Sequence, residues 1–387
     1  MTVLQLLLVA VSSVSSSRLL SPAYTMPVSE LSSKMGGKGR ALTCWKLMKH
    51  GIDPLGSADA ADVQRSLSPK ALARLRTGCS PSLARVVGPS AISSCGTRKL
   101  LLAMPSDGAL IETVLIPSER KRAVTTLCIS SQVGCRQGCS FCATGTMGLR
   151  RSLSLDEVLS QLFEALALVR REGLPPITNI VFMGMGEPLD NAEVVQAALE
   201  LMTGDLTFAL SKKSICVSTV APSPAHIETM VDMPARLAWS VHAANDKLRK
   251  VLVPTTSHSM VELRDAFANV LRRRPDSHGL MVECAMIDGV NDGPEHADEL
   301  IQLLEPLPGK TRVNLIPYNA NAGLGAAGRL FRPSSDASID AFKERIIGAG
   351  IICTRRVTRG DEEASACGQL VTSTAPARTR RSAEAVL

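Results

Sequence analysis

Seven short runs rich in β-branched residues alternate with amphipathic helical patterns after Lys99, and this alternation constrains the fold more than any other feature. The runs are Val124 to Ile129, Ile180 to Met183, Ile215 to Val220, Leu237 to Val241, Leu280 to Ile287, Val313 to Ile316 and Ile351 to Val357. Strands that alternate with helices form a parallel sheet covered by those helices. Such units, repeated over roughly 250 residues, predict an α/β fold built as a full or partial barrel of parallel strands, with functional side chains at the carboxyl ends of the strands.

Signals for helix ends support this pattern. Ser154 with Glu157 has the spacing of a capping box at the start of a helix, and Gly173 is placed to end that helix in a left-handed conformation. Ser259 with Glu262 repeats the capping-box spacing. Both helices are therefore predicted to cover the sheet.

The chain divides into four predicted parts. Helical spacing from Ala41 to about Leu83 indicates a small helical accessory domain, to which we assign residues 41–100. The barrel core is assigned to 101–360, and a C-terminal tail to 361–387. Beyond Leu370 the tail is rich in Ser, Thr, Ala and Arg, a composition typical of disorder.

Residues 1–40 are predicted to be a targeting segment or a disordered N-terminus. No acidic residue occurs from Met1 to Ser29, an apolar run from Val3 to Val11 precedes Ser-rich sequence, and basic residues follow. This pattern resembles a cleaved targeting segment, and the apolar run would also suit a secretory signal or the two-part signal of some complex plastids. An organellar stroma or matrix, in a plastid or mitochondrion, is the predicted location and the cytoplasm the alternative. No run of 18 apolar residues occurs, so we expect no transmembrane helix.

Composition narrows the class of protein. Apolar residues make up 45% and charged residues 20%, close to the globular average. The formal charge of +7 favours a polyanionic partner, whereas the aromatic content of 3% argues against rows of rings that stack on single strands. The eleven cysteines are an odd, unevenly spaced set, which indicates a reducing compartment rather than a disulfide framework.

Three of these cysteines form the most informative motif. Cys135, Cys139 and Cys142 follow the first predicted strand with C-x3-C-x2-C spacing on a glycine-containing loop, so three thiolates can face one metal centre. A structural zinc site needs a fourth nearby ligand, and no Cys or His follows closely after Cys142. A [4Fe-4S] cluster with three protein ligands instead leaves one iron open.

At this point the sequence resembles the radical S-adenosylmethionine (SAM) enzymes, in which SAM chelates that open iron. From about Ala41 to Leu370 it closely resembles the RlmN-type RNA methyltransferases. The resemblance is carried by Thr126 to Gly138, Met183-Gly-Met-Gly-Glu-Pro188, Ser240-Val-His242 with Asn245-Asp246, Met286 to Asp292, Asn314-Leu-Ile-Pro-Tyr-Asn319, Arg359-Gly-Asp and Ala366-Cys-Gly-Gln-Leu370. It implies a radical SAM core that methylates C2 of adenosine in large-subunit ribosomal RNA and in transfer RNA.

The resemblance also implies a SAM site at the strand ends. Gly186 and Glu187 follow a strand, where backbone can approach a ligand and a carboxylate can accept from an ammonium group. The remaining SAM contacts implied by the family are Ser218, Ser240, Val241, His242 and Asn319. One departure is Val220, which stands where a glycine commonly follows Ser-Thr in the family.

Two further cysteines carry the chemistry that the resemblance implies. One SAM methylates Cys367, and a second SAM is cleaved to a deoxyadenosyl radical that takes hydrogen from the S-methyl group. The carbon radical adds to the base, which joins enzyme and RNA. Release requires loss of the C2 proton, with Glu112 matching the acceptor, and attack on the first thiol by a second that matches Cys128, with disulfide formation.

The predicted partners are ribosomal RNA, transfer RNA and an external electron donor such as flavodoxin or ferredoxin, with the chain acting as a monomer. Basic clusters, among them Arg120 to Arg122, Arg150 with Arg151, and Arg355 with Arg356, predict a positive rim for RNA. Two alternatives stay open. One is methylation at C8 of the same adenosine, and the other is a metal-bearing RNA-binding protein without catalysis.

Overall fold

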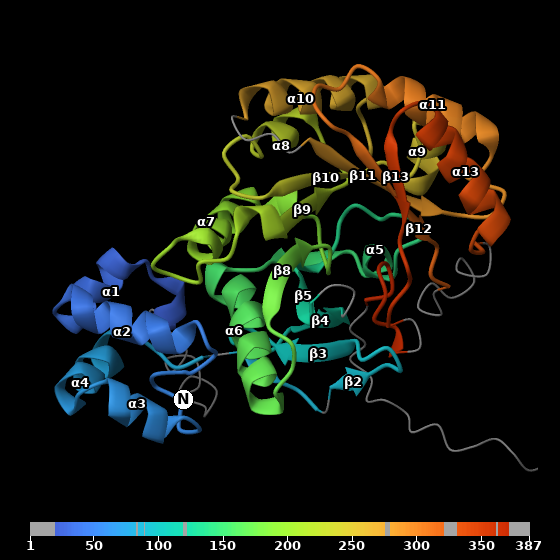
Figure 1. The fold of residues 1–387 in the computed structure, drawn as a ribbon. Coiled ribbons are helices and arrows are strands. Elements are labelled where there is room, and N and C mark those ends of the chain that lie inside the picture. Colours follow the sequence, from blue (N-terminus) through green and yellow to red (C-terminus); the bar gives the residue numbers. More distant parts are fainter. Residues whose placement is uncertain are drawn as a thin grey trace, which may run out of the picture.

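The computed structural model describes residues 20–82, 84–88, 90–118, 122–274, 279–320, 331–360 and 363–370. A mixed sheet of eleven strands forms the centre of this part of the chain. Helices lie along the outer side of the sheet, and a group of N-terminal helices packs at one end (Figure 1). The predicted α/β class is therefore confirmed.

Seven parallel strands form the larger part of the sheet and follow one another in chain order, from β5 inside the sheet to β13 at its edge. They are β5 (Val124–Ile129), β8 (Ile177–Phe182), β9 (Ile215–Thr219), β10 (Arg236–Ser240), β11 (Leu280–Met286), β12 (Arg312–Pro317) and β13 (Ile352–Arg355). Each predicted run forms one of these strands. Within the described residues β13 pairs only with β12, so the barrel is partial rather than closed.

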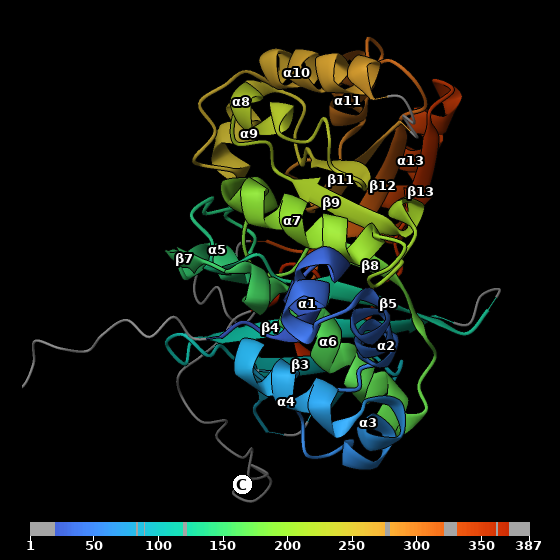
Figure 2. The ribbon, with the colours of Figure 1, turned by 90° about the vertical axis from the view of Figure 1, so that its left-hand side faces the viewer.

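The helices between the strands cover the convex side of the sheet (Figures 1 and 2). They are α6 (Leu155–Glu172), α7 (Ala192–Thr203), α8 (Pro224–Glu228), α9 (Asp246–Leu252), α10 (Met260–Arg273), α11 (Pro294–Leu304) and α13 (Asp336–Gly348). Ser154 and Glu157 form the predicted capping box of α6, and Gly173 ends that helix at φ 63°. Ser259 and Glu262 cap α10 in the same way.

Four further strands extend the sheet beyond β5, and the sequence pattern did not predict them. They are β1 (Arg85–Val86), β2 (Ala91–Ile92), β3 (Arg98–Ala103) and β4 (Leu110–Ser118), and every pairing among them is antiparallel. Because β4 pairs with β5, the extension is continuous with the barrel. The strands Arg85–Val86, Ala91–Ile92 and Arg98–Ala103 thus belong to the central sheet, whereas the sequence predicts a helical domain over 41–100.

The helical domain itself comprises α1 (Val28–Met35), α2 (Lys38–Met48), α3 (Ala60–Ser66) and α4 (Pro69–Gly78), preceded by the short helix η2 (Ala23–Thr25). Figure 2 shows these helices gathered near α6, at the end of the molecule away from α10. Tyr24 of η2 stacks on Phe163 of α6 with ring centroids 4.5 Å apart. This contact joins the helical domain to the barrel.

The predicted border at residue 40 is wrong for the described residues 20–40. Leu31 and Met35 of α1 are 0% exposed and belong to the same core as the barrel. The prediction failed because α1 is short, Ser-rich and flanked by Pro27 and Gly36, which read as loop. The predicted targeting residues 1–19 and the predicted disorder of 371–387 lie outside the described residues.

No helix within the described ranges is long and apolar enough to span a bilayer.

Candidate active site

A small hairpin holds the cysteine loop at the carboxyl end of β5. Strands β6 (Gln132–Gly134) and β7 (Leu149–Ser152) pair antiparallel and close the segment between them, which contains the short helix α5 (Ala143–Thr146). Gly134 has φ 76°, and a Cβ there would lie 1.9 Å from the carbonyl oxygen of Gly148. Only glycine therefore allows the two sides of the loop to meet.

The three motif cysteines line one cavity at the strand ends. Burial raises the pKa of the Cys135 thiol to about 12 and also raises the pKa values of Cys139 and Cys142. The cavity encloses about 820 Å³, a volume that includes the open solvent at its mouth. A metal centre that bound here would displace the thiol protons.

The arrangement fits a cluster better than a single ion. Within the described ranges, no three His, Cys, Asp or Glu side chains are placed to hold one metal ion. A zinc ion would need its sulfurs about 2.3 Å from a common point, whereas a [4Fe-4S] cluster attaches each thiolate to a different iron. Three thiols that line one cavity match the three protein ligands of such a cluster.

Glu187 lies on the wall of the same cavity, in the turn after β8. Its Oε1 accepts from the Leu189 N–H and its Oε2 from the Val220 N–H, both at 2.9 Å. Burial raises the pKa of this carboxyl to about 7, although the backbone donors oppose the shift. Gly186 precedes it at φ 99°, and a Cβ there would lie 2.6 Å from Gln132. The turn therefore brings backbone and a carboxylate close to any ligand.

Two serines and a glutamate from neighbouring strands also line this cavity. Ser218 of β9 and Ser240 of β10 line the cavity with hydroxyl oxygens 3.0 Å apart, and Ser218 also donates to Oε2 of Glu283 at 3.1 Å. The departure at Val220 leaves the strand end intact. Its N–H binds Glu187, and its carbonyl accepts from the Arg249 guanidinium.

His242 is held as a neutral side chain beside the cysteine loop. Its ring packs edge-on against Phe141, and its Nδ1 accepts from the Ala285 N–H at 3.1 Å. Burial lowers the pKa of His242 to about 3, so Nε2 carries the single proton and can donate into the cavity. Its φ of 55° lies in the left-handed region that non-glycine residues rarely adopt.

The depressed pKa of His242 predicts acid sensitivity. A histidine whose folded pKa lies below its unfolded value of 6.5 contributes stability that is complete above pH 6.5 and is lost as the pH falls toward about 3. In the cluster-free protein we expect this residue to account for about 1 kcal/mol of the stability lost between pH 7 and pH 5.5. Urea unfolding at both pH values should show a smaller loss for His242→Asn, whose side chain tolerates positive φ. The same loss in both proteins would contradict the assignment, and His258→Asn is the control.

The C-terminal segment folds over the mouth of this cavity rather than extending as a tail. The N–H of Ala143 donates to the Gly368 carbonyl at 2.8 Å, and the Thr144 hydroxyl donates to the Leu370 carbonyl at 2.6 Å. The Asn319 amide donates to the Cys367 carbonyl at 3.0 Å. Residues 363–370 are thus attached to the cysteine loop, and Figure 1 shows this red segment beside α5.

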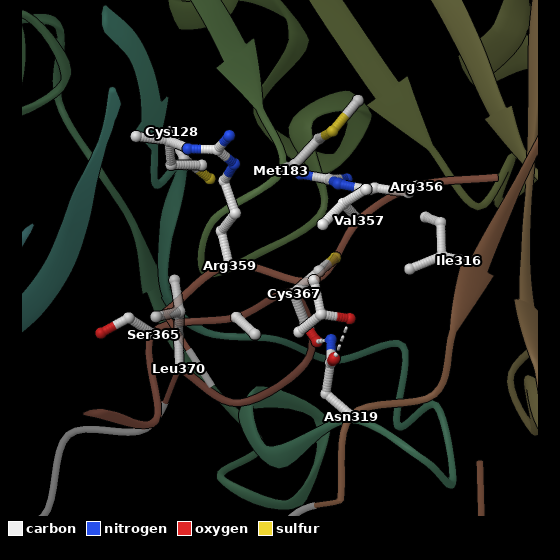
Figure 3. Close-up of a pocket in the computed structure, with 13 residues that line it drawn as sticks. Cys128, Met183, Ile316, Asn319, Arg356, Val357, Arg359, Ser365, Cys367 and Leu370 are labelled. Atoms are coloured by element: carbon white, nitrogen blue, oxygen red, sulfur yellow. Dashed lines mark hydrogen bonds between the residues drawn. The ribbon is translucent and has the colours of Figure 1, made fainter. Parts of the chain in front are cut away.

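Cys367 lies where two cavities meet. It lines the cavity of the motif cysteines and also a second, smaller cavity that contains Cys128 of β5 and Arg356. Figure 3 shows Cys128 and Cys367 on two sides of that second cavity. Both are free thiols in the structure. Cys367 is reached by solvent through the opening, whereas Cys128 is 8% exposed.

Both sulfurs lie against the cavity wall, where desolvation opposes ionisation, although Cys367 as a residue is exposed at the opening. Desolvation raises the pKa of Cys128 to about 12, with a further contribution from Cys367, and it raises the pKa of Cys367 to about 11. The Arg356 guanidinium counteracts the shift at both sulfurs.

Three predicted residues lie elsewhere. Glu112 of β4 is 5% exposed and forms an ion pair with Lys99 at 3.1 Å, and neither cavity includes it among its lining residues. Asn319 lines the second cavity and not that of the motif cysteines, because its amide holds the Cys367 segment. Val241 is buried beneath the strand ends, where its N–H donates to the Glu283 carbonyl at 2.9 Å.

Comparison with known proteins agrees with this geometry. Residues 129–304 match the model of the radical SAM superfamily. A dual-specificity RNA methyltransferase RlmN from Marinobacter nauticus is 42% identical over 313 residues, which cover 78% of this chain and 80% of that protein. Another from Psychrobacter arcticus is 41% identical over 309 residues, covering 75% and 73% of the two chains. The chain belongs to the RlmN family.

A solved relative supports the same conclusion for the fold. The crystal structure of a radical SAM methyltransferase from Sphaerobacter thermophilus matches with a TM-score of 0.79 and 33% identity. The match covers 90% of this chain and 99% of that one. As an RlmN family member, the protein is a radical SAM methyltransferase that uses a [4Fe-4S] cluster and SAM, so the alternative of a non-catalytic metal-binding protein is wrong.

Three polar residues of this RlmN family site were not predicted as part of the cavities. Glu283 lines the larger cavity from the apolar pattern of β11, and Arg356, predicted only as part of the basic rim, follows β13 and lines the smaller cavity. Arg249 of α9 is 1% exposed and donates to the carbonyls of Ser240 and Val241 at 2.8 and 2.6 Å. Glu283 is the register partner of Ser240 in the pairing of β10 with β11, so an alignment of these two strands could have found it. The spacing of residues in the sequence gives no such signal for the two arginines.

Proposed function

We propose that this protein methylates C2 of adenosine in large-subunit ribosomal RNA and in transfer RNA, with Cys367 as the carrier of the methyl group. The observation that carries the proposal is the position of Cys367, which lines both the cavity of the cluster cysteines and the cavity of Cys128. A carrier must face the methyl donor first and the resolving thiol later. The names of the two curated relatives support RNA as the substrate class.

The chemistry of the substrate explains why such a carrier is needed. Adenosine C2 is an electron-poor aromatic carbon without a lone pair, so it cannot displace the methyl group of SAM directly. When bound, the reduced cluster supplies the electron that cleaves SAM and so generates a radical. The residues of this chain then have to hold a methyl group that this radical can activate, and a sulfur can do so.

Each residue of the cavity has a proposed task. Cys135, Cys139 and Cys142 hold the cluster, and Gly186 and Glu187 bind the methionine end of SAM. Further SAM contacts are proposed at Ser218, Ser240 and His242, which line the same cavity, and at Val241 and Asn319 through their neighbouring backbone. His242 donates from Nε2 because its Nδ1 is occupied.

Release of the product falls to the second thiol. The adduct formed by radical addition first gives up one electron, the same number that SAM cleavage takes up. The Cys128 sulfur then attacks the Cys367 sulfur, an S–S bond forms, and the bond from Cys367 to the methylene carbon breaks. The electron pair of that bond stays on carbon, which takes up a proton and becomes the methyl group. Loss of the C2 proton needs a base. We propose Glu112, which lies on the face of β4 that also carries Val114, the register partner of Cys128.

Nucleoside analysis tests the function. The anaerobically reconstituted protein, a chemical reductant and methyl-labelled SAM are incubated with ribosomal and transfer RNA fragments, and the digested nucleosides are analysed by mass spectrometry. We expect labelled 2-methyladenosine from both RNAs. Label at C8 would replace the proposed regiochemistry, and no label in either RNA would contradict the function.

The finer partner assignments are also proposals. Cleavage of SAM consumes one electron, so we propose an external donor such as flavodoxin or ferredoxin, and a monomer as the working form. RNA contact is proposed for the basic clusters. Several of their charges are shared with acids, as in Arg151 with Asp107 and Arg355 with Asp336. Arg120 and Lys121 of the first cluster lie outside the described residues.

We propose organellar import as the role of the N-terminal segment, on the sequence pattern alone. Removal as far as Gly37 would strip away the buried helix α1, so the signal is expected to end before Leu20. Residues 1–19 fused to a fluorescent reporter should direct it to a plastid or mitochondrion. A reporter that stays spread through the cytosol would refute the proposal, and a fusion of residues 20–40 is the matched control.

A further inference from the structure

Arg356 occupies a position that serves two thiols. It follows β13 and lines the smaller cavity together with Cys128 and Cys367 (Figure 3). The side chain is 30% exposed, and its acidic neighbour Glu283 is at 4.0 Å, from Nη1 to Oε1. At that distance the two charges attract, but no hydrogen bond ties the guanidinium to Glu283.

Charged groups from several segments act on each thiol. The pKa of Cys128 is raised by Cys367 on the C-terminal segment and by Glu283, and it is lowered by Arg356. The pKa of Cys367 is lowered by Arg356, and it is raised by Glu283 and by Cys142 of the cluster loop. A second guanidinium in the cavity, that of Arg359, donates to the Pro117 carbonyl at 2.6 Å. Among the described residues, Arg356 is the cation whose charge favours the thiolate at both sulfurs.

The reverse effect is visible on the arginine. Burial lowers the pKa of Arg356, but Cys367, Glu283 and Cys128 raise it by more, and the net change is upward. This interaction agrees with the position of Arg356, Cys128 and Cys367 on the walls of one cavity.

We propose that Arg356 is a shared positioning residue that stabilises the thiolate of Cys367 while it accepts the methyl group and the thiolate of Cys128 while it releases the product. The inference rests on the proposed roles of these two cysteines. Two thiolates side by side would repel each other, so one cation cannot favour both at once. Methylation solves this problem because the S-methyl thioether of Cys367 carries no charge.

Transfer of the methyl group to Cys367 explains why Arg356 then stabilises Cys128 instead. The Cys367 thiolate attacks the methyl carbon of SAM, an S–C bond forms, the sulfonium S–C bond breaks, and neutral S-adenosylhomocysteine leaves. Cys367 has then lost its negative charge, and the Arg356 guanidinium is left facing Cys128. The same residue therefore acts at two separate steps in a fixed order.

Alkylation of the cluster-loaded protein tests this inference without RNA or SAM. Intact mass first confirms that Cys367 carries no methyl group, and the rate of its reaction with iodoacetamide is then followed by peptide mass spectrometry across pH. In Arg356→Met we expect the rate at pH 8 to fall about tenfold, which corresponds to an upward shift of one pKa unit. Arg356→Lys keeps the charge and should retain most of the rate. Exposed Cys95 in the same sample is the internal control.

A second variant guards against misfolding as the cause. Glu283→Gln removes the negative charge that opposes both thiolates, so it should speed the alkylation of Cys367. Opposite changes from Arg356→Met and Glu283→Gln are not expected from loss of structure. Equal rates in wild type and Arg356→Met, or equal slowing in the Lys and Met variants, would overturn the inference. If RNA methylation by the wild type is absent, the proposed function fails, whatever the alkylation rates are.

Discussion

Replacement of Cys128 with Ala should convert the protein into one that remains joined to its RNA. The variant keeps the cluster cysteines and Cys367, so methyl acceptance and addition to the base proceed, but no thiol is left to attack the Cys367 sulfur. A covalent protein–RNA adduct should accumulate, and the yield of free methylated RNA should fall at least about a hundredfold. Denaturing gels with end-labelled RNA would show the adduct, and nuclease digestion with peptide mapping would place it on Cys367.

The double variant makes this result diagnostic. Cys367→Ala should give neither adduct nor product, and Cys128→Ala with Cys367→Ala should match that single change, because the earlier failure hides the later one. Cys353→Ala is a suitable control, since Cys353 is another buried strand cysteine and lines neither cavity. Free methylated RNA at normal yield from Cys128→Ala would refute the assignment.

Loss of one cluster cysteine should abolish the reaction at its origin. Anaerobic reconstitution of the wild type should give about four irons per chain and an electron paramagnetic signal that changes on addition of SAM. Cys139→Ala removes one of three protein ligands from a buried site, so we expect less than about one iron per chain and no methylated RNA. Cys353→Ala should keep the wild-type iron content. Stoichiometric zinc without iron uptake in the wild type would contradict the cluster assignment.

Much of the barrel could be predicted because its signals are local. A buried parallel strand needs a continuous run of β-branched residues, and its helix needs an apolar face and a cap, as in Ile215–Thr219 and at Ser154. Strands β3 and β4 were missed because antiparallel pairing depends on a partner strand that local pattern does not identify. Helix α1 was missed because its stability comes from Leu31 and Met35 packing into the core, whereas its propensity is weak.

The site shows the same division. Cys135, Cys139 and Cys142 could be recognised because their close spacing on one loop brings them to the same cavity. The approach of Cys128 to Cys367 could be expected only from the family resemblance, since it depends on hydrogen bonds between distant segments. Asn319 illustrates the limit. The sequence places it correctly at a strand end, but only the structure shows that its amide supports the Cys367 segment.

The attachment of residues 363–370 to α5 also governs how the enzyme matures. The Gly368 and Leu370 carbonyls are bound by Ala143 and Thr144, the two residues that follow the last cluster cysteine. The hairpin of β6 and β7 holds this loop, and a bound cluster would add bonds to its three cysteines and stabilise it further. We therefore expect cluster insertion to strengthen docking of the carrier segment. Radical chemistry would then begin with the methyl acceptor already in place.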